Sequence, residues 1–387
     1  MSENASLAHA KKAKNDEFYT QYNVIEAEMN AYVEYNPDVF RGKTILLPCD
    51  DPEWSNFTKY FAANFSRFGL KKLISTSYAL GVRNREVSLF EEESSIYNAD
   101  LHKTHGKLFT LTTPPNFHGR VDIDNLQLTQ YLEGDGDFRS EEVTKLRNEA
   151  DIIITNPPFS LFREFLAWIM EADKKFIILG NVNAITYKEV FPLLKDNKLW
   201  LGYSIHSGDR KFNVPDDYPL EAANCGIDSD GKKFIRVKGV RWFTNIDHGK
   251  RHEWLKLDTM AHNLKFNKKL RKKLEKNFGT IAYPNYDNYD AIEVPFTECI
   301  PSDYDGVMGV PITFMDKYNP EQFEIIWQAT GNSYANAPKN ILTELKFDPS
   351  VKYGGGLGTA VVNGKACYSR ILIRAKNNDI NKDVNEQ

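Results

Sequence analysis

The sequence predicts an α/β protein with a mostly parallel sheet, followed by a smaller α+β domain. Strand-length apolar runs, such as 151–155 and 175–179, alternate with segments of helical periodicity. This alternation is typical of βαβ units, whose strands run parallel and whose ligands bind at the carboxyl ends of the strands. From residue 280 onward, short strands are mixed with turns. We therefore expect one domain over residues 1–255 and a second over residues 256–387.

The elements of the first domain follow from apolar periodicity and from helix start and stop signals. Ser55 is a good N-cap for the second helix, and Asn36-Pro37 should end the first one. Residues 81–120 are polar and give no clear element. The expected helices are 24–35, 55–68, 141–149, 161–171 and 188–195, and the expected strands are 44–47, 72–77, 151–155 and 175–179, with 199–205 and 234–244 as an antiparallel edge.

Composition excludes several classes of protein. The chain has 387 residues, of which 41% are hydrophobic and 26% charged, as in ordinary soluble proteins. No apolar run is long enough to cross a membrane, and no secretory signal is recognisable. The four cysteines lie far apart without a partner at metal-ligand spacing, so we expect no metal site, no disulfide framework and a cytoplasmic location. The polar tail 377–387 should be disordered.

The near-neutral total charge conceals a basic segment. Residues 230–276 contain 15 Lys and Arg against five Asp and Glu, a formal charge of +10, whereas the whole chain carries −4. Apolar residues recur every fourth position from Phe266 to Phe278, which predicts an amphipathic helix. Its cationic face would bind a polyanion or simply be solvated, and it contains Lys268, Lys269, Arg271, Lys272 and Lys273.

The strongest chemical signal is Asn156-Pro-Pro-Phe159, placed directly after an apolar strand. The two prolines stiffen the turn and remove two N–H donors. The Asn156 amide oxygen and the Pro157 carbonyl are then available to accept the two N–H groups of an exocyclic amine. Such contacts free the nitrogen lone pair for attack, while Phe159 stacks on the base. A plain strand-ending turn is the alternative reading.

This motif resembles the catalytic motif of amino-group DNA methyltransferases, which use S-adenosylmethionine. Together with segments 46–52 and 308–320, it makes the chain similar to the EcoRI-type family of adenine-specific DNA methyltransferases. The resemblance implies a Rossmann-like methyltransferase fold with a seven-stranded sheet and a C-terminal recognition domain. It also implies methylation of adenine N6 in double-stranded DNA by base flipping. Asn156, Pro157, Pro158 and Phe159 would be the catalytic residues.

The resemblance also implies a cofactor site. Residues 14–20 resemble the segment that closes over the methionine half of the cofactor, and residues 134–138 resemble the motif beside its adenine. Phe243 would pack against the flipped base. The turn after strand 44–47 departs from most methyltransferases because it has no glycine. The implied cofactor residues are Phe18, Tyr19, Thr20, Pro48, Cys49, Asp50, Asp135, Asp137 and Phe138.

Other readings remain open from the sequence. The same pocket suits cytosine N4 or an amino group of RNA or protein, and the fold also suits a DNA-binding decoy without turnover. Cys49 follows the first strand rather than the fourth, which disfavours a nucleophilic role. The glycine-rich segment 353–358 lacks the Lys and Ser/Thr of a phosphate loop. We expect a monomer that acts on double-stranded DNA, with a restriction endonuclease for the same site as a further partner.

Overall fold

The computed structural model describes residues 19–52, 55–79, 97–112, 130–206, 208–214, 220, 224–331, 333–351 and 356–376. The chain divides into two compact units, one formed by Met1–Val182 with Leu201–His248 and the other by Asn183–Trp200 with Gly249–Gln387. The first unit ends at His248, seven residues before the domain boundary that was expected at residue 255. The transfer of Asn183–Trp200 to the second unit was not expected. No helix among these residues is long and apolar enough to span a membrane.

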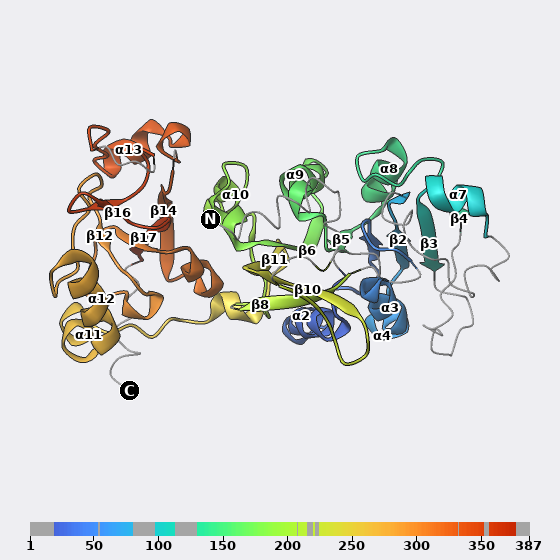
Figure 1. The fold of residues 1–387 in the computed structure, drawn as a ribbon, viewed down its shortest axis with the longest axis horizontal. Helices are drawn as coiled ribbons and strands as arrows, with labels where there is room; N and C mark the ends of the chain where they lie inside the picture. Colours follow the sequence, from blue (N-terminus) through green and yellow to red (C-terminus); the bar gives the residue numbers. More distant parts are fainter. Residues whose placement is uncertain are drawn as a thin grey trace. The chain divides into compact units, whose positions relative to one another are not determined.

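An eight-stranded sheet forms the centre of the first unit (Figure 1). The expected number was seven; the short strand β4 beyond β3 extends the sheet. In spatial order the strands are β4 (Gln130–Tyr131), β3 (Lys107–Thr112), β2 (Lys72–Thr76), β1 (Thr44–Leu47), β5 (Ile152–Thr155), β6 (Lys175–Asn181), β11 (Val240–Thr244) and β7 (Trp200–Leu201).

The centre of this sheet is parallel, as predicted, and its flanks are not. Strands β2, β1, β5 and β6 run parallel to one another. Strand β3 is antiparallel to β2 and to β4, and β11 is antiparallel to β6. The chain passes from β1 outward to β2 and later returns to the other side of β1 with β5. The carboxyl ends of β1 and β5 therefore form the point where the strand order reverses, which is the usual ligand site of such sheets.

Helices cover both faces of the sheet (Figure 1). Helices α2 (Tyr22–Tyr35), α3 (Asn56–Ala63) and α4 (Phe65–Phe68) lie on one face, and α8 (Glu141–Glu149) and α9 (Phe162–Glu171) on the other. The Ser55 side chain caps α3 by accepting a hydrogen bond from the Phe57 amide at 3.0 Å, as predicted. Gly69, at φ 61°, ends α4 in the left-handed conformation. The short helix α7 (Ala99–Thr104) precedes β3.

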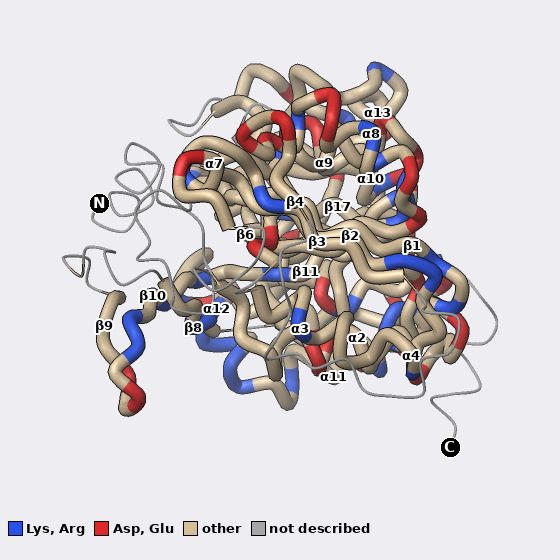
Figure 2. Tube along the Cα trace, turned by 90° about the vertical axis from the view of Figure 1, so that its right-hand side faces the viewer, with Lys and Arg blue, Asp and Glu red and all other residues tan. Residues whose placement is uncertain are grey.

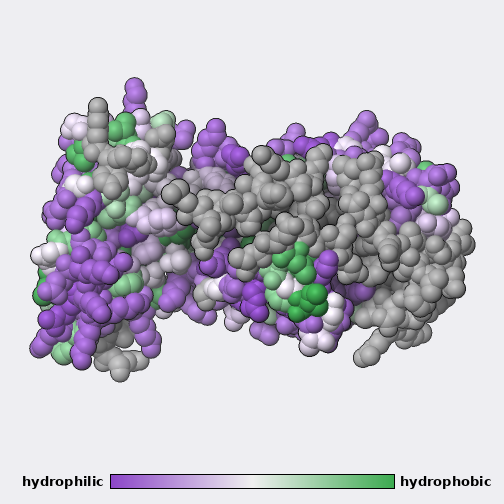
Figure 3. Space-filling model, viewed as in Figure 1, coloured by the Kyte–Doolittle hydropathy of each residue, from purple (hydrophilic) through white to green (hydrophobic). Residues whose placement is uncertain are grey.

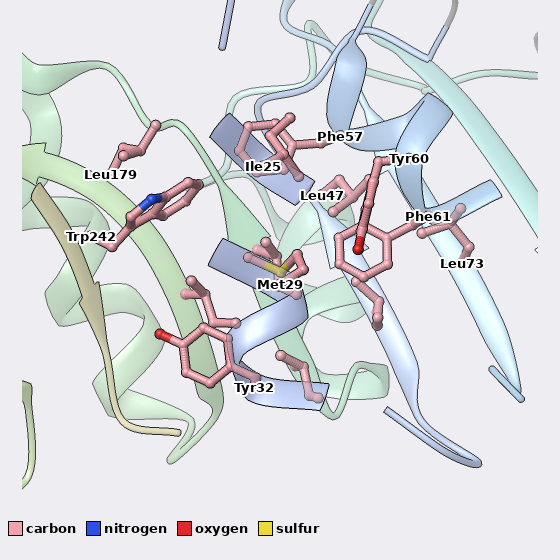
Figure 4. Packing of buried hydrophobic residues seen from close by; sticks show 14 of the residues in the cluster. Ile25, Met29, Tyr32, Leu47, Phe57, Tyr60, Phe61, Leu73, Leu179 and Trp242 are labelled. Atoms are coloured by element: carbon pink, nitrogen blue, oxygen red, sulfur yellow. The ribbon is translucent and has the colours of Figure 1, made fainter. Parts of the chain in front are cut away.

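The core beneath α2 and α3 is rich in aromatic side chains (Figure 4). The ring of Phe57 meets Trp242 edge-on, with centroids 6.0 Å apart. Trp242, Tyr32 and Phe61 are each at most 1% exposed. Residues of α2, α3, β1 and β11 all contribute to this cluster. The carboxyl end of β1 is therefore packed against a dense core.

Three strands within residues 209–238 form a separate antiparallel sheet rather than the edge of the main one. Its order is β8 (Asp209–Asn213), β10 (Lys233–Lys238) and β9 (Cys225–Ile227). The expected strand 234–244 is broken at Gly239, whose φ is 71°, so that β10 and β11 join different sheets. Phe212, Ile235 and Val237 point from this sheet into the core.

The second unit has a four-stranded sheet in the order β12 (Ile292–Glu293), β13 (Met308–Pro311), β17 (Arg370–Ala375) and β14 (Phe323–Ala329). Its helices are α10 (Phe191–Lys195), α11 (Met260–Phe266), α12 (Lys268–Phe278) and α13 (Lys339–Glu344), and β15 (Val361–Val362) pairs with β16 (Lys365–Ala366) as a hairpin. The ring of Phe191 packs edge-on against Trp327, with centroids 5.3 Å apart. This contact explains why residues 183–200 belong to this unit.

Candidate functional site

The predicted catalytic and cofactor turns lie next to each other at the carboxyl ends of β1 and β5. Strand β1 leads into Pro48, Cys49 and Asp50, and β5 leads into Asn156. The two strands are paired in parallel, with Leu46 opposite Ile153. Residues more than 100 positions apart in the sequence are thereby brought to one edge of the sheet.

The Asp50 carboxylate joins the two turns. One oxygen accepts a hydrogen bond from the Thr155 hydroxyl at 2.6 Å, and the other accepts one from the Ser55 hydroxyl at 2.7 Å. Asp50 is only 7% exposed. Burial raises its pKa to about 7, although the two hydroxyl donors oppose this shift. The side chain therefore acts as a clasp between β1, α3 and β5.

The backbone of the Pro48–Asp50 turn is fixed by β2. The Ser75 hydroxyl donates to the Asp50 carbonyl at 2.6 Å, and the Thr76 hydroxyl donates to the Pro48 carbonyl at 3.1 Å. Pro48 is buried, and Cys49 is half-buried. These two hydrogen bonds order a turn that contains no glycine.

The Asn156-Pro-Pro-Phe159 segment is ordered and half-buried. Pro157 is buried, whereas Asn156, Pro158 and Phe159 keep part of their surface accessible. The amide oxygen of Asn156 is itself shielded from solvent. Phe159 opens a short 3₁₀ turn, Phe159–Leu161, and its ring meets Phe212 edge-on with centroids 6.5 Å apart.

The N-terminal segment reaches the same region. Tyr19 forms an antiparallel bridge with Asn213, with N–O distances of 2.9 and 3.1 Å. The side-chain amide of Asn56 donates to the Thr20 carbonyl at 2.7 Å, and Thr20 is buried. Asn213 follows Phe212, which packs on Phe159 of the catalytic turn. Asn56 follows Ser55, which binds Asp50 of the cofactor turn, so the segment is linked to both predicted turns. Phe18 lies outside the described residues.

The segment 134–138 packs against the end of β2. The Ala79 amide donates to the Asp135 carbonyl at 2.7 Å. Gly136, at φ 81°, lies so close to β2 that a Cβ atom would come within 2.1 Å of the Ser77 carbonyl oxygen. Asp137 pairs with Arg139 at 2.6 Å, which lowers the pKa of Asp137.

Two predicted ring contacts are not supported by this geometry. Phe138 is 5% exposed and packs on Phe165 and Trp168, with centroids 5.0 and 5.5 Å away. Phe243 is fully buried and packs on Phe162 at 5.0 Å. The expected contact of Phe243 with a flipped base is therefore not retained, because the main sheet uses this ring for its own core.

The predicted basic helix lies in the second unit as α12, although it begins later than expected. Asn267 interrupts the pattern and caps α12, accepting a hydrogen bond from the Leu270 amide at 2.9 Å. Leu270 and Leu274 are fully buried, but Phe266 belongs to α11 and is 58% exposed. The expected apolar face is thus shorter by one residue at its start.

The cationic face of α12 is exposed. Lys and Arg follow one another along this helix (Figure 2), and the surface over α11 and α12 is hydrophilic (Figure 3). Its five predicted contact residues are all exposed: Lys268, Lys269, Arg271, Lys272 and Lys273. Lys269 pairs with Glu298 at 3.1 Å and lies 4.1 Å from the centre of the Phe296 ring. The remaining four keep their charge available to a polyanion.

Sequence reasoning missed the residues that hold the site together. Ser55 was expected only as a helix cap and Thr155 only as a strand residue, yet both bind Asp50. Lys107 is fully buried and lies 3.5 Å from the Asp51 carboxylate. The sequence signal for this buried lysine was its place at the start of the largely apolar strand β3, but the surrounding residues 81–120 looked polar. Among the described residues, no group of three His, Cys, Asp or Glu is arranged to hold a metal ion.

A parallel-centred sheet with two turns side by side at its switch point is the architecture of doubly wound proteins that bind ligands at this place. Comparison with known families specifies the class. The family described as "Adenine-specific methyltransferase EcoRI" matches residues 6–376. The chain belongs to this family and is an adenine-specific methyltransferase. The predicted family and the predicted type of enzyme are confirmed.

Three relatives match nearly their whole length. The chain is 43% identical to "Type II methyltransferase M.EcoRI" of Escherichia coli, covering 96% of this chain and 97% of that protein. It is 35% identical to "Type II methyltransferase M.MgeORF184P" of Mycoplasma genitalium, covering 94% and 97%. It is 34% identical to "Type II methyltransferase M.MpnI" of Mycoplasma pneumoniae, covering 96% and 98%. No solved structure matches the chain significantly.

Proposed function

We propose that this enzyme transfers a methyl group from S-adenosylmethionine to adenine N6 within a specific sequence of double-stranded DNA, after flipping the adenine out of the duplex. The observation that supports this most is that the Asp50 carboxylate joins the Pro48–Asp50 turn to Thr155, the last residue of β5 and the neighbour of Asn156, through a hydrogen bond of 2.6 Å. A transferase needs its donor and acceptor sites side by side. The hydrogen bond from Thr155 to Asp50 holds the two turns next to each other.

The residues at the switch point fit S-adenosylmethionine. Segment 134–138 lies tightly against the residue that follows β2, because a Cβ atom added at Gly136 would come within 2.1 Å of the Ser77 carbonyl oxygen. Pro48, Cys49 and Asp50 would hold the cofactor together with Asp135 and Asp137, and Tyr19 and Thr20 would cover it. When bound, S-adenosylmethionine supplies an electrophilic methyl group. The buried Phe138 anchors the 134–138 segment rather than contacting the cofactor.

Asn156 and Pro157 bind and orient the adenine amine. The Asn156 amide oxygen accepts one N–H and the Pro157 carbonyl accepts the other, which draws the nitrogen towards a tetrahedral geometry. Phe159, braced edge-on by Phe212, stacks on the base. No general base has to act before transfer, since the nitrogen becomes more acidic once it is methylated.

The second unit is the DNA-recognition part of this proposal. The exposed residues Lys268, Arg271, Lys272 and Lys273 would contact phosphates and supply the salt-dependent part of the affinity. The enzyme would act as a monomer, and a restriction endonuclease for the same site would be its functional partner. The Type II names of the relatives support this restriction–modification context.

Asn156→Ala tests the proposal. We expect methyl transfer to unmethylated plasmid DNA to fall by roughly 10²–10³-fold, the usual cost of losing one preorganised polar group. Binding of DNA and of S-adenosylmethionine should stay near wild type. Asn148→Ala, which removes an exposed amide on α8, is the matched control and should be fully active. A fully active Asn156→Ala enzyme would contradict the assignment, and wild-type DNA binding without cofactor binding would indicate a decoy.

A further inference from the structure

Tyr368 is an unusually exposed aromatic residue on the second unit. It lies between β16 and β17 and is 69% exposed, the highest value among the large hydrophobic side chains that the structure describes. A single exposed apolar residue needs no explanation by itself. The unusual feature is the support beneath it, because the turn that bears this ring is fixed from several sides.

A buried ion pair holds the backbone of Tyr368. Arg370 donates from Nη1 to the Tyr368 carbonyl at 2.8 Å. The same guanidinium binds Glu293 with two bonds, Nη2 to Oε1 at 2.6 Å and Nε to Oε2 at 2.9 Å. The Glu293 side chain is 1% exposed and that of Arg370 is 11% exposed. The Tyr286 hydroxyl also donates to Glu293.

Both neighbours of Tyr368 are fixed as well. The Cys367 amide donates to the Ala360 carbonyl at 2.8 Å, and the Ser369 and Thr330 hydroxyls lie 2.7 Å apart. Buried ion pairs add little net stability compared with apolar packing, so their main effect here is to fix geometry. A turn held this firmly presents its exposed ring in one orientation.

The turn also lies close to the cationic helix. The side-chain amide of Asn363, at the tip of the β15–β16 hairpin, donates to the Phe278 carbonyl at the end of α12, at 3.4 Å. The five residue-to-residue steps from Asn363 to Tyr368 span at most roughly 17 Å. One turn of B-DNA is about 34–36 Å long. A duplex whose phosphates lie on α12 therefore remains within reach of Tyr368.

We propose that Tyr368 contacts bases of the DNA and helps to set its sequence preference, with Arg370 and Glu293 as positioning residues. This inference rests on the proposed function. Phosphate contacts from lysines fix the position of a duplex but carry no sequence information, which must come from groups that meet base edges. The Tyr368 ring offers an apolar face for a base or a thymine methyl group, and its hydroxyl is a donor and an acceptor.

The test compares binding to two fluorescein-labelled duplexes, one bearing the sequence that the wild-type enzyme methylates in a bacterial host and one with that sequence scrambled. Tyr368→Ala should lower the ratio of the two affinities by roughly 5- to 150-fold, without changing the salt dependence or cofactor binding. Tyr368→Phe should retain the part of the sequence preference that comes from contact of the ring with a base. Tyr35→Ala, which removes an exposed tyrosine of α2, is the matched control.

The outcomes separate the two proposals. An unchanged affinity ratio in a folded Tyr368→Ala protein would overturn the role of Tyr368 and leave the proposed function intact. A loss of affinity that is equal for both duplexes would overturn it too, because it would indicate a contact with the backbone only. A wild-type enzyme that neither methylates DNA nor prefers any duplex would overturn both proposals.

Discussion

The two units bury a carboxylate in contrasting ways. Asp50 in the first unit is met by two neutral hydroxyls, and burial raises its pKa to about 7. Glu293 in the second unit is met by the guanidinium of Arg370 and the hydroxyl of Tyr286. Hydroxyl donors do not cancel the charge of Asp50, whereas Arg370 cancels that of Glu293. The first arrangement leaves a group that changes its protonation near neutral pH, and the second gives a permanent brace.

This difference matches what each unit has to do. The first unit holds two turns together at the edge of a sheet, where residues distant in sequence must meet around small ligands. In the proposed function, the second unit presents a fixed turn and a cationic helix face to a large polyanion. Removal of each carboxylate should therefore have distinct consequences.

The largest effect on stability is expected in the second unit. Glu293→Ala leaves the Arg370 charge buried without its partner, so the free energy of unfolding should fall by about 3–5 kcal/mol. Urea unfolding of the variant and the wild type measures this loss of free energy. Glu324→Ala removes a half-exposed partner of Arg374 at 3.7 Å and should cost less than about 1 kcal/mol. Equal stability of Glu293→Ala and wild type would show that the ion pair is no brace.

Asp50 should make stability depend on pH. Because its folded pKa is raised to about 7, the folded chain keeps this proton after the unfolded chain has released it, and the stabilisation is lost as pH rises from about 4 to 7. Asp50→Asn keeps a neutral group there. Between pH 5.5 and pH 8, the wild type should lose about 2 kcal/mol more than Asp50→Asn in urea unfolding. Parallel pH profiles would show that Asp50 is ionised throughout.

A smaller effect per residue is expected on the cationic face of α12. Lys272→Ala and Lys273→Ala should weaken binding to every duplex alike and lower the slope of log affinity against log salt by roughly one each. Stability should change by less than about 0.5 kcal/mol, since both side chains are exposed. Lys339→Ala on α13 is the control. A change in sequence preference would place these lysines at base edges instead.

The sequence predicted the local features of the first unit well. Strand β1 and helix α8 have the expected bounds, and Ser55 is the expected cap, because each depends on residues within one turn or one strand. The Asn156 motif follows a buried strand, as predicted. The clasp of Asp50 with Thr155 was not predictable, since it joins residues 105 positions apart.

Other misses have equally physical causes. Residues 234–238 were assigned to the edge of the main sheet but form β10 of the three-stranded sheet, because alternating apolar residues show a strand but not its neighbours. Phe243 looked like a base contact, yet an apolar residue in a buried strand gives no sign of which layer it faces. Asn183–Trp200 joins the second unit through Phe191 and Trp327, a contact across 136 positions.

The central claim is that Asn156 and the Pro48–Asp50 turn, which Asp50 links to Thr155, form an adenine methylation site. Native-DNA sequencing of a methylation-deficient bacterial host that expresses the chain tests it most directly. We expect N6-methyladenine within a single sequence motif for the wild type and almost none for Asn156→Ala expressed at the same level. Unmodified adenine with soluble wild-type protein, or equal modification by Asn156→Ala, would contradict it.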